Sequence, residues 1–95
     1  MKIKDLLKDA TKWTQDALAR NSAHEIVRHD DPTATSWCLM GLVWYCYPLK
    51  DHAQIALKIF TYLEDHNDDK EIEVWNDDKH RTVAEIKALV ETLDI

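Results

Sequence analysis

The 95-residue chain is long enough for one domain with a single hydrophobic core. Hydrophobic residues make up 45% and charged residues 32%, which is typical of a folded globular protein and excludes a disordered chain. The formal net charge of −6 argues against a general nucleic-acid-binding protein, because phosphates require a cationic face. The single glycine argues against β-meanders and against the glycine-rich nucleotide-binding motifs.

The first predicted element is an amphipathic helix from Ile3 to Ala19. Its apolar residues recur every three or four positions, and lysines and aspartates occupy the opposite face. From Arg20 to Asp31 this periodicity is lost, so we expect a polar connection there. Within it, Ile26 and Val27 form an apolar pair that should attach the connection to the core.

The second predicted helix, from Thr33 to Tyr47, is the centre of the expected fold. Asp31 is its expected N-cap, and Pro32 suits the first helical position because its missing N–H is not needed there. Apolar residues surround the helix axis, which predicts a helix buried among others. Gly41 lies in the middle and costs roughly 1 kcal/mol relative to alanine, so we expect a neighbouring helix to approach closely there.

The third and last predicted helices have N-terminal capping signals. Asp51 begins the third helix, with Gln54 three residues later, and the helix ends in the acidic run from Glu64 to Asp69. The last helix has Thr82 as its N-cap and Glu85 at the third helical position, which is a good capping box. Both helices carry an apolar stripe at helical spacing.

The segment from Glu71 to Trp75 alternates between polar and apolar residues. One short strand without a partner cannot form a sheet, so we expect an extended strap that packs on the bundle. The predicted fold is therefore all-α: one domain over residues 1–95, a compact four-helix bundle with a short extended strap before the last helix.

None of the potential metal ligands has the spacing of a metal site. His24 and His29 are five residues apart in a predicted loop, and the acidic run from Asp65 lacks the glycine and glutamate of a calcium loop. Cys38 and Cys46 are about 12 Å apart along one predicted helix, too far for a disulfide. We therefore expect packed thiols in a reducing compartment, no metal and no cofactor.

Two groups of residues are candidates for binding. The first is an acidic stretch. Charge runs of this kind usually form a solvated face, but this one could instead complement a basic protein groove. It contains Glu64, Asp65, Asp68, Asp69, Glu71 and Glu73. The second group lies between Trp75 and Thr82, where an indole, an amide, carboxylates and a guanidinium precede a helix N-terminus. It is either a core network or a pocket.

Three stretches resemble a family of small bacterial and phage-borne proteins of unknown function, DUF6197. They are residues 13–21 (WTQDALARN), residues 36–41 (SWCLMG), and Trp75-Asn76-Asp77 with Arg81-Thr82. The chain differs from the family pattern at Asp16, at Ser36 and at residues 78–80. The resemblance implies one shared arrangement, a core network or a pocket, whose expected members are Gln15, Arg20, Trp37, Trp75, Asn76, Asp77 and Arg81. Ser36 is a further candidate, because the rim of any site is expected at the N-terminal end of the second predicted helix, around Ser36 and Trp37.

We expect a non-catalytic protein-interaction module, because no spacing indicates a catalytic site. We expect a phage or mobile element to encode this module, which could inhibit a host defence complex as an anti-CRISPR protein does. The alternative is an anionic-ligand or enzymatic pocket, in which Arg20 or Arg81 would hold the anion and Asp77 would be the base. A third hypothesis is self-association through Tyr45 or Tyr47.

The sequence also predicts a cytoplasmic protein that binds neither membranes nor nucleic acid directly. Residues 1–5 (MKIKD) contain no apolar signal-peptide core, and no apolar stretch reaches ~18 residues.

Overall fold

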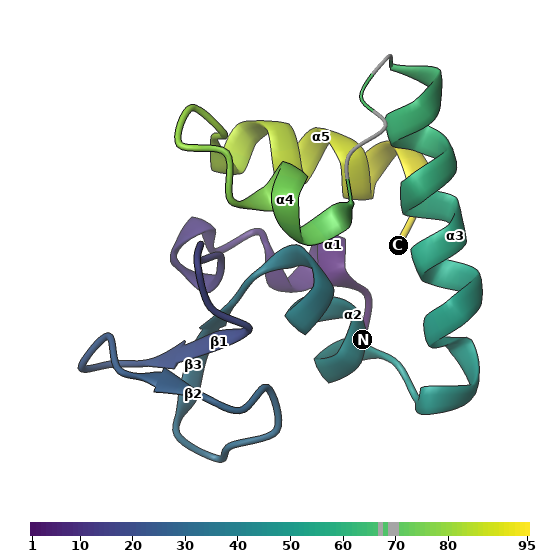
Figure 1. The fold of residues 1–95 in the computed structure, drawn as a ribbon. Helices are drawn as coiled ribbons and strands as arrows, with labels where there is room; N and C mark the ends of the chain where they lie inside the picture. The colour runs from purple at the N-terminus through teal and green to yellow at the C-terminus, as the bar shows by residue number, and fades with distance from the viewer. Residues whose placement is uncertain (67, 69–70) are drawn as a thin grey trace.

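The structure, a computed structural model, describes residues 1–66, 68 and 71–95. Within these residues the chain forms five α-helices, one 3₁₀ helix and a three-stranded antiparallel sheet (Figure 1). In chain order the elements are α1 (Ile3–Leu6), η1 (Ala10–Lys12), β1 (Ala19–Asn21), β2 (Ile26–Val27), β3 (Ala34–Trp37), α2 (Leu39–Cys46), α3 (Leu49–Asp65), α4 (Ile72–Asn76) and α5 (Val83–Leu93). The fold is mixed α/β, so the predicted all-α four-helix bundle is wrong.

The sheet has the order β2-β1-β3, and both strand pairs are antiparallel. Between β1 and β2, the Asn21 side chain accepts hydrogen bonds from the N–H groups of Ala23 and Glu25, at 2.9 and 3.0 Å. His24 has a φ of 62°, in the left-handed region that tight turns use. The polar connection predicted over Arg20 to Asp31 thus contains strands. With two or three residues each, these strands are too short to show the alternation that predicts a strand.

The predicted helix over Ile3 to Ala19 is wrong beyond its first turn. α1 contains only four residues, and the Asp9 carboxylate then accepts hydrogen bonds from the N–H and the hydroxyl of Thr11, at 3.0 and 2.6 Å. Such local bonds compete with the helical backbone, and the chain forms the short η1 there. Beyond η1 the chain is no longer helical, and Trp13 forms a parallel bridge to Trp37 of β3.

The predicted helix over Thr33 to Tyr47 begins only at Leu39, because the preceding residues form β3. Asp31 does not cap a helix. Its carboxylate accepts a hydrogen bond of 2.7 Å from the Thr33 N–H, within a turn that leads into β3. β-Branched threonines at positions 33 and 35 favour extended backbone, and β1 provides the strand partner that sequence analysis did not foresee.

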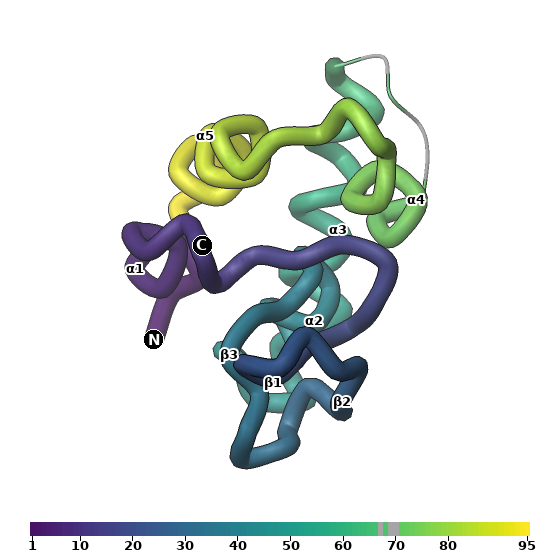
Figure 2. The backbone as a smooth tube through the Cα atoms, turned by 90° about the vertical axis from the view of Figure 1, so that its left-hand side faces the viewer, coloured from purple at the N-terminus to yellow at the C-terminus, as the bar shows by residue number. Residues whose placement is uncertain are grey.

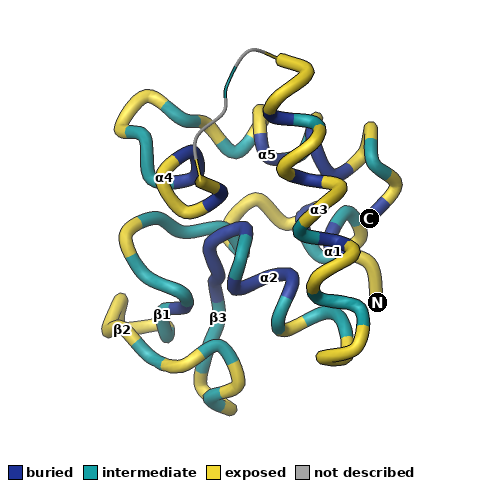
Figure 3. Tube along the Cα trace, turned by 45° about the vertical axis from the view of Figure 1, so that its right-hand side comes forward, coloured by how far each residue is buried: buried dark blue, intermediate teal, exposed yellow. Residues whose placement is uncertain are grey.

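The helical part of this segment, α2, is apolar and central, as predicted, and contacts α1, α3 and α4 (Figure 3). Its N-cap is Cys38, whose Sγ accepts a hydrogen bond of 3.3 Å from the Gly41 N–H. A Cβ atom at Gly41 would lie 2.2 Å from the carbonyl oxygen of Leu18. The expected close approach is therefore present, but the neighbour is the backbone just before β1 and not a helix.

α3 and α5 correspond to the third and last predicted helices. α3 begins at Leu49, directly after Pro48, two residues before the predicted start at Asp51. α5 begins after Thr82, and its capping box with Glu85 is present as predicted.

The predicted extended strap from Glu71 to Trp75 is wrong, because this segment contains the short helix α4. Ile72, Trp75 and Asn76 are all buried. Their spacing of three and four residues places them on one face of a helical turn, which fits burial against the core. The alternation seen in the sequence was too short to distinguish the two structures.

The helices surround one core, to which every α-helix contributes a buried residue. α3 stands along one side of the molecule and the sheet lies on the other (Figure 1). The chain ends meet below α5 (Figure 2), where the Lys4 N–H donates a hydrogen bond of 3.0 Å to the Ile95 carbonyl. None of the helices in the described ranges has the length and apolar character needed to cross a membrane.

Candidate functional site

Asn76 at the end of α4 is the centre of a polar network, and its residue surface is 0% exposed. Its Oδ1 accepts hydrogen bonds from the Trp13 indole, at 2.7 Å, and from the Leu39 N–H at the start of α2, at 2.9 Å. Its Nδ2 donates to the Thr14 carbonyl, at 3.2 Å, and to Asp77 Oδ1, at 2.9 Å. The amide thereby uses both donors and both acceptor positions. We call these five residues the Asn76 network.

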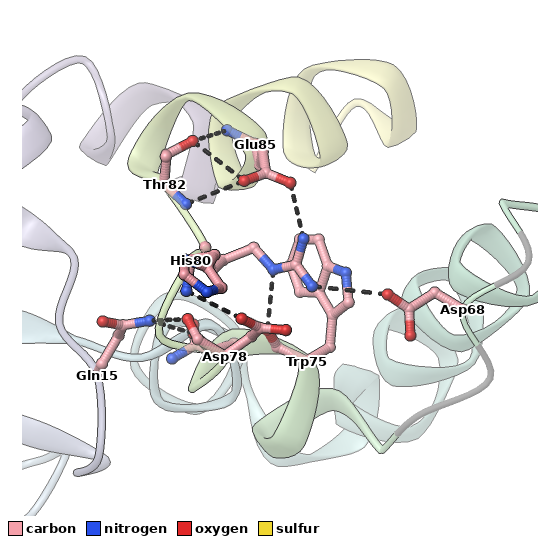
Figure 4. A network of polar contacts seen from close by, with 9 residues as sticks. Gln15, Asp68, Trp75, Asp78, His80, Thr82 and Glu85 are labelled. Atoms are coloured by element: carbon pink, nitrogen blue, oxygen red, sulfur yellow. Dashed lines mark hydrogen bonds and ion pairs between the residues drawn. The ribbon is translucent and has the colours of Figure 1, made fainter.

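Gln15 and Asp77 connect the same two segments a second time. Gln15 Nε2 donates hydrogen bonds to the carbonyl oxygens of Asn76 and Asp78, at 2.9 and 2.8 Å, and the second contact is visible in Figure 4. Asp77 Oδ1 also accepts a hydrogen bond of 2.9 Å from the Asp16 N–H. The segment before β1 is therefore fastened to the end of α4 by side-chain and backbone groups together.

Arg81 lies between α4 and α5 with its side chain 11% exposed. Its Nε donates to the Trp75 carbonyl at 2.9 Å, and its guanidinium lies 4.0 Å from the centroid of the Trp75 ring. Nη1 lies 2.7 Å from Glu85 Oε2, and Nη2 lies 3.5 Å from Asp68 Oδ2 (Figure 4). The hydrogen bond from Arg81 is the main cause that lowers the pKa of Glu85. Two carboxylates thus face one guanidinium.

The remaining candidates, Arg20, Ser36 and Trp37, lie in the sheet. Ser36 and Trp37, expected near the N-terminal end of a helix, belong to β3. Arg20 donates to the His24 carbonyl, at 3.0 Å, and to the Gln15 carbonyl, at 3.3 Å. Ser36 is buried in β3, opposite Arg20 in the strand register. The Trp37 indole donates to a backbone carbonyl, that of residue 29, at 2.9 Å. Two contacts join this group to the residues around Asn76: the one between Arg20 and Gln15, and a hydrogen bond of 3.0 Å that the Thr14 N–H donates to the Trp37 carbonyl.

The sequence did not predict three partners of Asn76. Trp13 and Thr14 belong to the same family-like stretch as Gln15, and this proximity was the available signal. The Leu39 N–H could not be found, because its position depends on where α2 begins.

Both cysteines are free thiols in the structure. Cys38 is buried, and burial raises its pKa. Burial also raises the pKa of Cys46, to about 11. A thiol with a raised pKa is a poor nucleophile at neutral pH, so both residues behave as packed side chains. Within the described part of the chain, no group of three or more His, Cys, Asp or Glu side chains could hold a metal ion.

The predicted acidic residues cluster around the end of α3 and the start of α4. Four of them are exposed: Glu64, Asp65, Glu71 and Glu73. Asp68 is half-buried and faces Arg81, whereas Asp69 lies outside the described residues. Two of the exposed carboxylates, those of Glu71 and Glu73, border an apolar groove.

This groove lies beside α3 and has a volume of about 360 Å³. Its lining includes Met40, Ala53, Ala56, Leu57, Phe60 and Ile72, together with the carboxylates of Glu71 and Glu73. A second groove, of about 750 Å³, lies between α3 and α5, and Leu57 lines this groove too. Leu57 therefore separates the two grooves.

Three large apolar side chains of α3 are exposed: Leu49 by 83%, Leu57 by 64% and Phe60 by 37%. We call the exposed side of α3, with Leu49, Ala53, Ala56, Leu57 and Phe60, the α3 ridge. The sequence signal for it was present, since these residues also recur at helical spacing, but periodicity alone did not reveal that α3 has two apolar faces.

Fold and site together define a small mixed α/β domain with a self-satisfied polar network and an exposed apolar helix side. The chain belongs to DUF6197, a family of unknown function, whose family model matches residues 1–93. This match confirms the resemblance seen in the sequence. Comparisons with curated proteins and with solved structures find no match.

Proposed function

We propose that this protein is a non-catalytic protein-interaction module that binds its partner through the α3 ridge. The observation that carries this proposal is the row of exposed apolar side chains on α3. Large apolar groups that cluster on a surface, next to grooves, are typical of protein-binding sites. A helix side of this kind is also the usual element in helix-in-groove recognition.

The polar candidate residues favour this proposal over the pocket hypothesis. The Asn76 amide has a protein partner for each of its four hydrogen-bonding positions, so a ligand would have to displace one of them. The cavity of about 260 Å³ that Arg81 lines is also lined by Asp68 and Glu85. One guanidinium against two carboxylates gives this cavity a net negative charge, which opposes the binding of an anion.

Exposed carboxylates beside the α3 ridge add a polar rim to the apolar centre. Glu71 and Glu73 line the groove on one side of the ridge, and Asp65 lines the groove on the other. An apolar centre with a charged rim is the usual arrangement of a protein interface, in which the rim sets specificity. Inhibition of a host defence complex, anti-CRISPR-like, is one specific form of this proposal, supported only by small size and acidity.

The free thiols Cys38 and Cys46 support a reducing compartment, and we include a cytoplasmic location in the proposal.

A capture experiment tests the proposal. The tagged protein is expressed together with an untagged copy in a bacterial host, and bound proteins are identified by mass spectrometry. We expect one stoichiometric protein, either a host protein or the untagged copy, that the wild type binds and that Leu57→Glu loses. Ile26→Glu is the matched control, because Ile26 is exposed by 66% but lies in β2, away from α3. Equal capture by both variants, or no stoichiometric protein, would refute the proposal.

A further inference from the structure

The groove of about 360 Å³ lies where α2, α3 and α4 meet. Its apolar lining comes from Met40 of α2, from the α3 ridge and from Ile72 of α4. Phe60 of the ridge stays 37% exposed beside it. The unbranched side chain of Met40 can adapt to the shape of a neighbour, as methionines do at many binding surfaces. The groove can therefore accept apolar side chains of a partner.

The charged groups at this groove all have the same sign. The carboxylates of Glu71 and Glu73 line it, and its described lining residues include no lysine and no arginine. Glu64, one helical turn beyond Phe60 on α3, is exposed as well. The apolar floor is thus bordered by negative charge.

Several other carboxylates on the surface have a cation beside them. Asp94 pairs with Lys4, and Asp30 lies 3.0 Å from Arg28. Among the described residues, the side chains of Glu71 and Glu73 have no such partner, neither an ion pair nor a hydrogen bond. A cationic side chain of a binding partner would complement them.

The walls of the groove favour a helix over an extended segment. Ala53 and Phe60 lie inside the 17-residue helix α3, whose backbone groups bond to one another. An extended segment would bury its own N–H and C=O groups against this wall without partners, which is unfavourable. An α-helix satisfies its own backbone and brings only side chains to the groove.

The larger groove, of about 750 Å³, gives no comparable indication. Both Lys58 and Asp65 line it, so its charges do not select a partner of one sign.

We propose that the groove where α2, α3 and α4 meet binds an amphipathic, basic helix of a partner protein. This inference rests on the proposed function, because it names the element of the partner that the α3 ridge contacts. Apolar side chains of that helix, three and four residues apart, occupy the groove. Its lysines or arginines face Glu71 and Glu73, and these ion pairs orient the helix in the groove.

Selection from a library of random phage-displayed peptides of about 16 residues, a length that can form a helix, tests the proposal. The wild-type protein is the bait. We expect the bound sequences to combine apolar residues at helical spacing with lysines or arginines beside them. A fluorescein-labelled synthetic peptide with the selected consensus then gives the Kd for each variant by fluorescence anisotropy.

Two variants test the two parts of the groove separately. Glu73→Lys replaces an attraction with a repulsion and should weaken peptide binding about five- to tenfold. Phe60→Gln replaces the apolar ring with an uncharged polar group and should weaken it by roughly tenfold or more. Glu91→Lys is the matched control, because it makes the same change of charge at an exposed glutamate of α5 and should bind like the wild type. Circular dichroism checks that each variant is folded.

The outcomes separate this inference from the proposed function. Selected sequences without basic residues, or without helical spacing, overturn the basic helix. So does binding by Glu73→Lys that is no weaker than binding by Glu91→Lys. Capture of the untagged copy alone, lost in Leu57→Glu, overturns the basic helix but leaves the proposed function intact. The proposed function itself fails if Leu57→Glu retains every protein that the wild type captures.

Discussion

Replacing Asn76 with alanine should show that the Asn76 network holds the fold together. The substitution removes four hydrogen bonds from a side chain that is 0% exposed. The Leu39 N–H is left unpaired in a buried position, and the Trp13 indole and the Thr14 carbonyl each lose one partner. At about 1–3 kcal/mol for the buried group and about 0.5–1.5 kcal/mol for each half-buried group, the loss is about 3 kcal/mol.

This loss is a large fraction of the ~5–15 kcal/mol that stabilises a small domain. It corresponds to a decrease in Tm of about 10–25 °C for a chain of this length. Urea unfolding followed by tryptophan fluorescence, with a thermal scan by circular dichroism, measures both quantities.

Asn21→Ala is the matched control for this experiment. Asn21 also accepts hydrogen bonds from two backbone N–H groups, but they belong to exposed residues of the hairpin turn, where water can replace the side chain. We expect a loss below about 1 kcal/mol. If Asn76→Ala is no more destabilising than Asn21→Ala, the network does not support the fold, and the pocket hypothesis for Asn76 gains weight instead.

Three further predictions concern other parts of the molecule. Gly41→Ala should lower the free energy of unfolding by about 2–3 kcal/mol, because the new Cβ would lie 2.2 Å from the Leu18 carbonyl oxygen; urea unfolding checks this. The hydrogen bond from Lys4 is the main cause that lowers the pKa of Asp94 from 3.8 to about 2, so this carboxylate stabilises the fold above about pH 4 and the contribution is lost toward pH 2. Asp94→Asn should therefore make the free energy of unfolding depend less on pH between about 4 and 2. The same pH dependence in this variant and in the wild type would contradict this prediction. Because burial raises the pKa of Cys46 from 9.0 to about 11, iodoacetamide at pH 8 should alkylate it about 100-fold more slowly in the native protein than in urea, as followed by mass spectrometry.

The long helices could be predicted from the sequence because their signals are local. The capping box of Thr82 and Glu85 and the periodicity of α3 depend only on residues three or four positions apart. The sheet could not be predicted, because its pairing joins Ala19 to Trp37 across the chain. Without a visible strand partner, the sequence predicts residues 33–37 as part of the following helix.

The sequence could predict which residues belong together in the candidate site, but not whether they form a core network or a pocket. Family resemblance grouped Gln15 with Asn76 and Asp77, and hydrogen bonds in the structure join all three. Whether such a group is a network or a pocket depends on the backbone carbonyls and N–H groups that face it, which a sequence does not show. The α3 ridge was missed for a related reason, since a helix with two apolar faces differs from an ordinary amphipathic helix only once its neighbours are known.

Backbone NMR on the isotopically labelled protein, titrated with the unlabelled protein that the capture experiment identifies, tests the central claim most directly, namely that the α3 ridge is the binding surface. The amide shifts of residues 49–64 should change as the partner is added, whereas those of β1 and β2 should stay constant. Leu57→Glu should abolish the change. Shifts at Tyr45 and in the sheet, with none along α3, would contradict the account.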